Sequence, residues 1–190
     1  MEFSSLVVGS LFSIWKLLAD VKTSFSVGSE QEGYPIMFGI DTRSEGNAAW
    51  MEHQILDHVK QALRVTLKWQ VPSVGMPRKL SSVRFTLKSF FRHLERLMNL
   101  EERDGYMVVV AELKPNMQHR IKRLEHDHAQ FRQWAEQLLA EVDEISEYQC
   151  DQFNQACQKI ADLLSSVDQH DREEIQLLQE TLLCDEGGEG

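Results

Sequence analysis

Apolar residues recur at spacings of three and four over most of the chain from residue 48 onward, and this pattern limits the possible folds most strongly. Such spacing is typical of amphipathic helices that bury one face. The inward positions of segment 79–104 are Leu80, Val83, Leu87, Phe90, Leu94, Leu97 and Glu101. Similar stripes predict helices over 48–70, 116–145 and 147–183. Four long amphipathic helices with short connections predict an all-α fold, an antiparallel up-down four-helix bundle.

Proline, glycine and capping residues mark where these helices should end. Pro72 and Pro77 bracket a loop between the first and the second helix. The second helix should end within residues 104–115, which begin with Asp-Gly and close with a proline. Ser146 and Gln149 have the spacing of a capping box, which predicts that the fourth helix opens there.

The first 46 residues follow a different pattern. Residues 5–19 are mostly apolar, but Lys16 interrupts them, and the run is shorter than the ~20 residues that a membrane span needs. No basic residue precedes Lys16, so a secretory signal is not expected. We expect a short amphipathic helix that packs on the rest of the chain or on a protein partner, followed by a loop. The predicted domains are therefore an N-terminal extension, 1–46, and a bundle, 47–190.

Charge and cysteine content exclude several classes of protein. The chain has 30 acidic and 20 basic side chains, a formal net charge of −10, which argues against nucleic acid or an anionic membrane as main partner. Of the three cysteines, Cys150 and Cys157 would lie roughly 10 Å apart on one helix, too far for a disulfide. We therefore expect reduced thiols and a cytoplasmic protein. No phosphate-binding loop or nucleophile elbow supports nucleotide or acyl chemistry.

Polar residues interrupt the apolar stripes of all four predicted helices. They are His53, Glu101, His128, His170 and Glu174. A buried carboxylate is costly unless it is paired or bound to a metal ion. Imidazoles and carboxylates that point into a helical bundle are typical ligands of an oxygen-activating iron site. We therefore predict that these five residues bind a metal ion.

Each of these residues also has a simpler interpretation. A single inward histidine can be a hydrogen-bonded core residue, and Glu101 and Glu174 lie near predicted helix ends, where they could reach solvent. The common register of all five residues favours the metal site. The histidines His58, His119 and His126 fall away from the central stripes, and we expect them to be exposed or partly buried.

The order of the five residues resembles the order of the ligands in hemerythrin-like proteins, particularly bacterial hemerythrin-like (HHE cation-binding) domains. Three segments carry the resemblance: 100–106, which closes the second helix, 124–128, which ends in acid-His, and 170–180 on the fourth helix. The resemblance covers about residues 50–190. It implies a helical bundle that binds iron.

The resemblance also implies how the five residues would divide between two iron ions. Glu101 and Glu174 would bridge the ions. His128 and His170 would bind one ion, and His53 would bind the other.

Two positions depart from the pattern of members with a full di-iron centre. This chain has Leu97 where those members have a histidine one turn before the glutamate of the second helix. It has Arg132 where many have a second histidine on the third helix. The second iron would therefore lack ligands, which water, Glu102 or a displaced His93 would have to supply. On helical geometry, His93 lies about 100° away from the stripe.

Three functions remain open. The first is a non-catalytic module whose iron, mononuclear or dinuclear, binds or senses oxygen, nitric oxide or a related small ligand. The second is a di-iron oxidase, which needs Glu-x-x-His on two helices, whereas the pattern occurs once here, at Glu125 and His128. The third is a metal-free bundle that acts through protein contacts. Leu97 and Arg132 favour this third function, and the inward His-Glu pair of the fourth helix opposes it.

Overall fold

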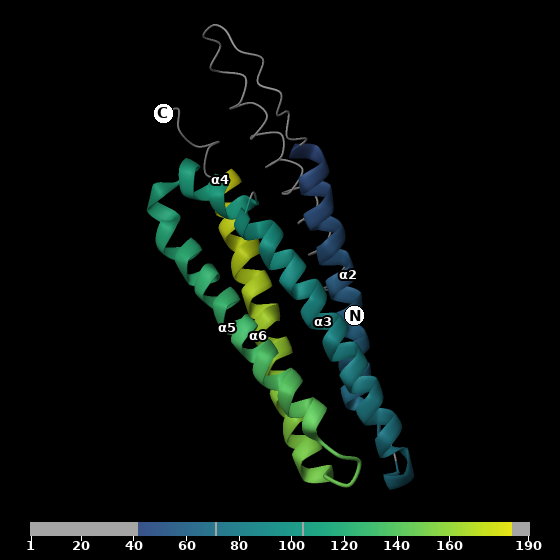
Figure 1. The fold of residues 1–190 in the computed structure, drawn as a ribbon. Coiled ribbons are helices and arrows are strands. Elements are labelled where there is room, and N and C mark those ends of the chain that lie inside the picture. Colours follow the sequence, from purple (N-terminus) through teal and green to yellow (C-terminus); the bar gives the residue numbers. More distant parts are fainter. Residues whose placement is uncertain (1–41, 71, 104, 184–190) are drawn as a thin grey trace, which may run out of the picture.

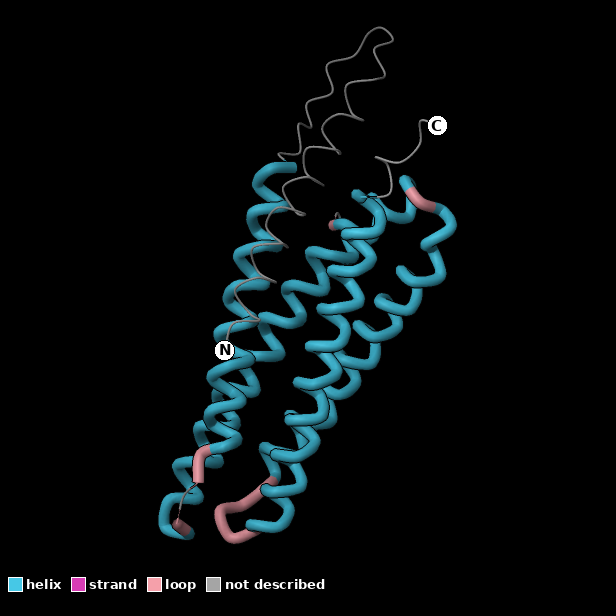
Figure 2. Tube along the Cα trace, turned by 180° about the vertical axis from the view of Figure 1, so that it is seen from behind, coloured by secondary structure: helices cyan, strands magenta, loops and turns pink. Residues whose placement is uncertain are grey.

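Four long helices make up most of the part of the chain that the computed structural model describes, residues 42–70, 72–103 and 105–183 (Figure 1). They are α2 (Thr42–Lys68), α3 (Met76–Arg103), α5 (Gln118–Glu144) and α6 (Cys150–Leu183). A shorter helix, α4 (Tyr106–Leu113), and the 3₁₀ turns Ser73–Gly75 and Pro115–Met117 lie in the connections. None of these residues is in a strand, as Figure 2 also shows. The predicted all-α class is therefore confirmed, and the helices form a bundle.

Each long helix packs against two others. α2 contacts α3 and α6, and α5 contacts the same two helices. In Figure 1, α4 lies at one end of the bundle between α3 and α5, and the loop that joins α5 to α6 lies at the other end. The inward faces of the long helices are therefore covered by neighbours, which explains why each helix carries one apolar stripe.

The predicted inward positions are buried and form two apolar clusters. The large cluster includes Leu56, Leu63, Leu87, Phe90, Leu97, Phe131, Ile160 and Val167. The end cluster, around α4, includes Ala49, Tyr106, Val110, Ile121, Leu124 and Leu177. On α2, α5 and α6, the predicted metal-site residues fall between a member of the end cluster and a member of the large cluster. A buried polar layer thus separates the two apolar clusters.

Two of the helices begin earlier than the sequence predicted. α2 begins at Thr42, six residues before the predicted start, so that Gly46 lies within the helix. A glycine inside a helix costs only about 1 kcal/mol and need not end it. α3 begins at Met76 and contains Pro77, which we expected in the loop. Proline is tolerated in the first turn of a helix because its missing N–H has no partner there.

Helix α4 was not predicted, because we expected residues 104–115 only to end the second helix. Its eight residues are apolar except for the exposed Glu112, and they show no helical alternation. The run contains buried Tyr106, Met107, Val109 and Val110. Gly105 precedes the helix, and a Cβ atom there would lie 2.5 Å from the Cα of Glu101. The chain can therefore turn so tightly after α3 only with glycine at this position.

The connection between α5 and α6 contains the predicted capping pair. The backbone N–H of Ser146 donates to Gln149 Oε1 over 2.7 Å. The helix itself begins at Cys150, three residues beyond the predicted start at residue 147. Arg84 of α3 donates to the carbonyl oxygens of Val142 (3.0 Å) and Ile145 (2.6 Å), which fixes the end of α5 against α3.

The N-terminal helix expected over residues 5–19 lies outside the described residues, as does Cys184. The division of the chain into an extension and a bundle therefore stays a prediction. Cys150 and Cys157 are both free, as expected. No described helix has the length and apolar character needed to span a membrane.

Candidate metal centre

The five residues predicted to bind metal come from all four long helices, and all of them are buried. Their exposed fractions are 9% for His53, 1% for Glu101, 0% for His128, 5% for His170 and 1% for Glu174. The polar groups lie in two sets that could each hold a metal ion. We call Glu101, His128 and His170 the two-histidine group, and His53, Glu101 and Glu174 the two-glutamate group. Glu101 belongs to both groups.

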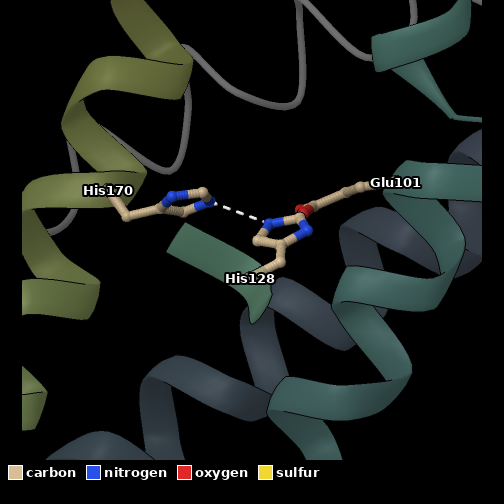
Figure 3. A group of neighbouring side chains, drawn as sticks. All are labelled: Glu101, His128 and His170. Carbon is tan, nitrogen blue, oxygen red and sulfur yellow. Dashed lines mark hydrogen bonds and ion pairs between the residues drawn. The ribbon is translucent and has the colours of Figure 1, made fainter. Parts of the chain in front are cut away.

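The two-histidine group combines one side chain each from α3, α5 and α6, which point toward one another in Figure 3. His128 Nε2 lies 3.0 Å from His170 Nε2 and 3.3 Å from Glu101 Oε2. The two imidazole rings are tilted by 48° with their centroids 4.7 Å apart. The rings of His170 and Phe131, a member of the large cluster, also meet in a T-shaped arrangement with their centroids 5.4 Å apart.

Both imidazoles of this group have a carboxylate at their outer nitrogen. His128 Nδ1 lies 2.8 Å from Glu102 Oε1, and His170 Nδ1 lies 3.4 Å from Asp127 Oδ2. A carboxylate accepts hydrogen bonds, so these contacts assign the ring hydrogen of each histidine to Nδ1. The two Nε2 lone pairs then face each other over 3.0 Å. Such an arrangement is repulsive unless a cation or a shared proton lies between the two nitrogens.

The two-glutamate group contains two carboxylates and one imidazole, and one of its contacts is longer than those of the two-histidine group. His53 Nε2 lies 3.2 Å from Glu101 Oε1 and 3.8 Å from Glu174 Oε1. Both of these carboxylate oxygens are fully buried, and neither accepts a hydrogen bond of ordinary geometry from the described residues. Two glutamates with one imidazole therefore leave negative charge without full compensation at this position.

The buried charges shift the pKa values of these side chains in opposite directions. Burial opposes the charged form of Glu101, but contacts with His128 and His53 outweigh it and lower the pKa of Glu101 to about 2. Burial and the neighbouring charge of Glu101 raise the pKa of Glu174. Burial would lower the pKa of His53, yet its contacts with Glu101 and Glu174 raise that pKa well above its usual value. The layer therefore favours positive charge next to Glu101.

These positions fit a bound metal ion in their chemistry and their spacing. An ion about 2.1 Å from each of two ligands at right angles separates those ligands by about 3 Å. The contacts of His128 with His170 and Glu101 (3.0 and 3.3 Å), and that of His53 with Glu101 (3.2 Å), have this size. Carboxylate oxygens without a hydrogen bond and inward lone pairs are the donors that a cation would satisfy. The residues present therefore fit a metal ion.

His93 and Glu102, which the sequence offered as further ligands of a second iron, have other partners. His93 Nδ1 contacts Glu52 Oε1, and Arg96 Nε lies 3.6 Å from the other oxygen of Glu52. Glu102 faces His128 and Arg132. Neither His93 nor Glu102 belongs to either of the two candidate groups.

Leu97 and Arg132, the two positions that depart from the pattern of full di-iron centres, take part in core packing and ion pairs. Leu97 is buried within the large cluster. Arg132 binds Glu102 and Glu95 through its guanidinium group. Glu125 is exposed, so the only Glu-x-x-His pattern of the chain brings no carboxylate into the polar layer.

The remaining histidines lie at the surface, as predicted. His58, His119 and His126 are all exposed. Their hydrogen bonds are local, to Gln54 O, Asn116 O and Gln130 Nε2. None of them is part of either group.

Sequence reasoning gave no role to Asp127 or Tyr106, and it considered Glu102 only as an additional ligand. Glu102 and Asp127 directly follow or precede a predicted ligand, so their place next to the site was visible in the sequence, but their orientation was not. Tyr106 is buried in the end cluster, and burial together with the charges of Glu174 and Glu101 raises its pKa well above the usual value. A tyrosine at the start of an unpredicted helix gave no periodic signal.

A buried lysine connects two of the helices that carry the site. Lys60 of α2 lies 2.6 Å from Asp171 Oδ2 and 3.4 Å from Asp168 Oδ1, both on α6. Burial opposes its charge, but the carboxylates of Asp171 and Asp57 outweigh burial and raise the pKa of Lys60. This ion cluster therefore fixes α2 against α6 two helical turns from His53.

Fold and site together define a class: a helical bundle whose buried histidines and glutamates could hold metal ions. The chain belongs to the family of the hemerythrin HHE cation-binding domain, whose model matches residues 50–182. This match confirms the resemblance, and membership of the family implies metal binding. No curated protein and no solved structure matches the chain.

Proposed function

We propose that this domain binds iron in its buried polar layer and uses it to bind or sense oxygen, nitric oxide or a related small ligand, without catalysing a reaction. His128, His170 and Glu101 would hold one ion. His53, Glu101 and Glu174 would hold a second ion less completely, with Glu101 as the shared ligand. When bound, ferrous iron would supply an affinity for small diatomic molecules that histidine and carboxylate side chains lack.

The observation that carries this proposal is the position of Glu101 in both groups. One carboxylate whose two oxygens face different imidazoles, Oε2 toward His128 and Oε1 toward His53, is arranged as a bridging ligand. A residue that served only to neutralise a core histidine would need one such contact.

The other side chains of the layer orient these ligands and keep water away. Glu102 and Asp127 hold the outer nitrogens of the two imidazoles and so direct both Nε2 atoms inward. The large cluster and the end cluster close the layer on either side. Electrostatic attraction between a cation and the carboxylates is strengthened in such a dry environment.

The proposed antiparallel up-down order of the helices agrees with this site. In α2 and α5 the ligands come in the half nearer the start of the helix, at His53 and His128. In α3 and α6 they come in the half nearer the end, at Glu101, His170 and Glu174. Helices that alternate in direction bring these positions to the same level of a bundle.

A metal-free bundle that works through protein contacts is the second candidate. Two observations favour it: Leu97 fills the position of a missing ligand with core packing, and Arg132 is fully engaged by Glu102 and Glu95. Under this alternative, the polar layer would be held by its internal hydrogen bonds and ion pairs alone.

Metal analysis separates the two candidates. Protein from iron-supplemented cells should contain iron and show an ultraviolet-visible absorption that iron-free protein lacks. Glu101→Gln keeps the size of the side chain but removes the shared charged ligand, so it should lose most of the iron while keeping its helical circular dichroism. His58→Ala, which changes an exposed histidine of α2, is the matched control. A parent protein without iron, or equal iron in Glu101→Gln and the parent, would refute the proposed site.

A further inference from the structure

The position where related proteins would place a second histidine of the third helix is occupied here by an arginine with a specific set of partners. The guanidinium of Arg132 binds Glu102 through two parallel contacts, Nη1 to Oε1 over 2.9 Å and Nη2 to Oε2 over 3.0 Å. Such a fork fixes the plane of the carboxylate as well as its position. The same oxygen, Glu102 Oε1, is the acceptor at His128 Nδ1.

We propose that Arg132 is a positioning residue for the metal centre, which acts through Glu102 to hold His128 with its Nε2 lone pair directed at Glu101 and His170. The proposal rests on the proposed metal-binding function, because it concerns how one of the ligands is oriented. It gives a role to a residue that replaces a ligand of the family pattern.

A second glutamate, Glu95, also holds the guanidinium of Arg132 in place. Its Nε donates to both carboxylate oxygens of Glu95, over 3.0 and 3.2 Å. Three of its nitrogens are therefore engaged by two carboxylates of α3. Because the guanidinium is planar and its donors are fixed relative to one another, these contacts leave it one orientation.

The chain of contacts determines which nitrogen of His128 carries the hydrogen. Glu102 already accepts two N–H groups of Arg132, and a carboxylate bound to a guanidinium has no hydrogen to donate. The contact of 2.8 Å with His128 therefore requires that Nδ1 is the donor. In the neutral imidazole Nε2 then keeps its lone pair, and it lies 3.3 Å from Glu101 Oε2 and 3.0 Å from His170 Nε2.

The same contacts remove Glu102 from the set of possible ligands. Both of its oxygens are directed at Arg132, and one also faces the outer nitrogen of His128. Glu102 could otherwise compensate for the missing histidine beside the two-glutamate group. Arg132 thus strengthens the two-histidine group and leaves the two-glutamate group with fewer ligands.

The test replaces Arg132 in the full chain and follows both metal binding and the His128 ring. Arg132→Met removes both the positive charge and the paired hydrogen bonds to Glu102. Arg132→Lys keeps the charge but cannot form that pair of parallel hydrogen bonds. Arg123→Met is the matched control, because Arg123 is another α5 arginine that contacts a glutamate, Glu173, over 3.2 Å. Each protein is titrated with Fe²⁺ alone under anaerobic conditions, and the ¹⁵N shifts of the histidine rings are measured in the metal-free state.

We expect Arg132→Met to bind Fe²⁺ about 10- to 100-fold more weakly than the parent, as removal of a support behind a ligand typically does. Arg132→Lys should fall between the two, and Arg123→Met should equal the parent. The His128 ring of the parent should carry its hydrogen at Nδ1, and Arg132→Met should show a mixture. A purely structural arginine would lower the melting temperature without changing the tautomer.

The two readouts keep this inference separate from the proposed function. Iron binding by Arg132→Met as tight as by the parent, with an unchanged His128 tautomer, would overturn the role of Arg132. A parent that binds no Fe²⁺ would refute the proposed function. In that case the ring shifts still decide whether Arg132 orients His128.

Discussion

The two-histidine group and the two-glutamate group share Glu101, but their ligands are held differently. In the two-histidine group, each imidazole has a carboxylate behind it, and the nitrogens and oxygen that face one another lie 3.0–3.3 Å apart. In the two-glutamate group, His53 faces two carboxylates, and the wider contact, to Glu174, is 3.8 Å. The first group is therefore organised before a metal binds, and the second is mainly an excess of negative charge.

Under the proposed function, this difference suggests a dinuclear site of which only one half is fully organised. Oriented lone pairs give affinity because little has to be rearranged when the ion binds. Uncompensated carboxylates attract a cation but supply fewer ligands and less fixed geometry. We therefore expect the two-histidine group to fill first and the two-glutamate group to fill second and more weakly.

The largest expected effect comes from removing one ligand from each group. His170→Ala should abolish the tighter binding step of an Fe²⁺ titration, a loss of about 100-fold or more, because a direct ligand of that group is gone. Glu174→Ala should remove the weaker step and leave the tighter one. The measurement is calorimetric titration under anaerobic conditions together with iron analysis.

His58→Ala serves as the control for both variants, because His58 is exposed and hydrogen-bonds only to Gln54 O among the contacts described. Identical iron content in the parent, His170→Ala, Glu174→Ala and the control would contradict the site altogether. Loss of the same binding step in both ligand variants would contradict the division into two groups.

A smaller effect, on stability and on both groups at once, should follow from Gly105→Ala. The added Cβ would lie 2.5 Å from the Cα of Glu101 and 2.6 Å from its carbonyl oxygen, and backbone atoms cannot move aside as a flexible side chain can. We expect a loss of about 1–3 kcal/mol in the free energy of unfolding, as for other overpacked positions. Because Glu101 belongs to both groups, both iron-binding steps should weaken together. Thermal unfolding and the same titration measure these effects. An unchanged melting temperature would show that the turn can accommodate a Cβ atom at residue 105.

Periodicity predicted most of this fold because a helix that buries one face must repeat its apolar residues. The stripe from Leu80 to Glu101 is buried at every position that the sequence indicated. Periodicity did not predict α4, because the sequence of this short helix has no alternation of apolar and polar residues. The run Tyr106–Leu113 is only eight residues long and apolar except for Glu112, so it shows no helical alternation of its own. Gly46 and Pro77 are compatible with helices at the positions they occupy, although both residues usually mark ends.

For the site, the register on each helix predicted which side chains meet, and the structure brings all five together. The partners behind them could not be predicted in the same way. Glu102 and Arg132 lie off the central stripes, and their contact depends on the rotation of α3 against α5. Whether Glu102 would be a ligand or a support was therefore a question that spacing along one helix could not answer.

The smallest expected effect is that of Leu97→His. This variant would add a ligand to the two-glutamate group and so reduce its difference from the two-histidine group. Leu97 is 3% exposed and lies one helical turn before Glu101, so a histidine there would point toward the same layer. If the chain holds a partial iron site, the new imidazole adds a ligand, and iron content should rise at a modest cost in stability. If the bundle is metal-free, the change buries an imidazole without a partner. The loss should then be about 1–3 kcal/mol with no iron gained.

Leu94→His distinguishes the gain of a ligand from the mere introduction of a buried histidine. Leu94 is 4% exposed and belongs to the same large cluster, but it lies two turns from Glu101 and therefore outside the polar layer. Both variants lose a core leucine, so both should melt at a lower temperature without iron. Fe²⁺ should raise the melting temperature of both variants, because both keep the two-histidine group and a ligand that binds the folded state alone stabilises it. We expect the larger increase for Leu97→His, whose new imidazole adds a ligand to the weaker group. Equal increases in the two variants would show that position 97 cannot complete the weaker group.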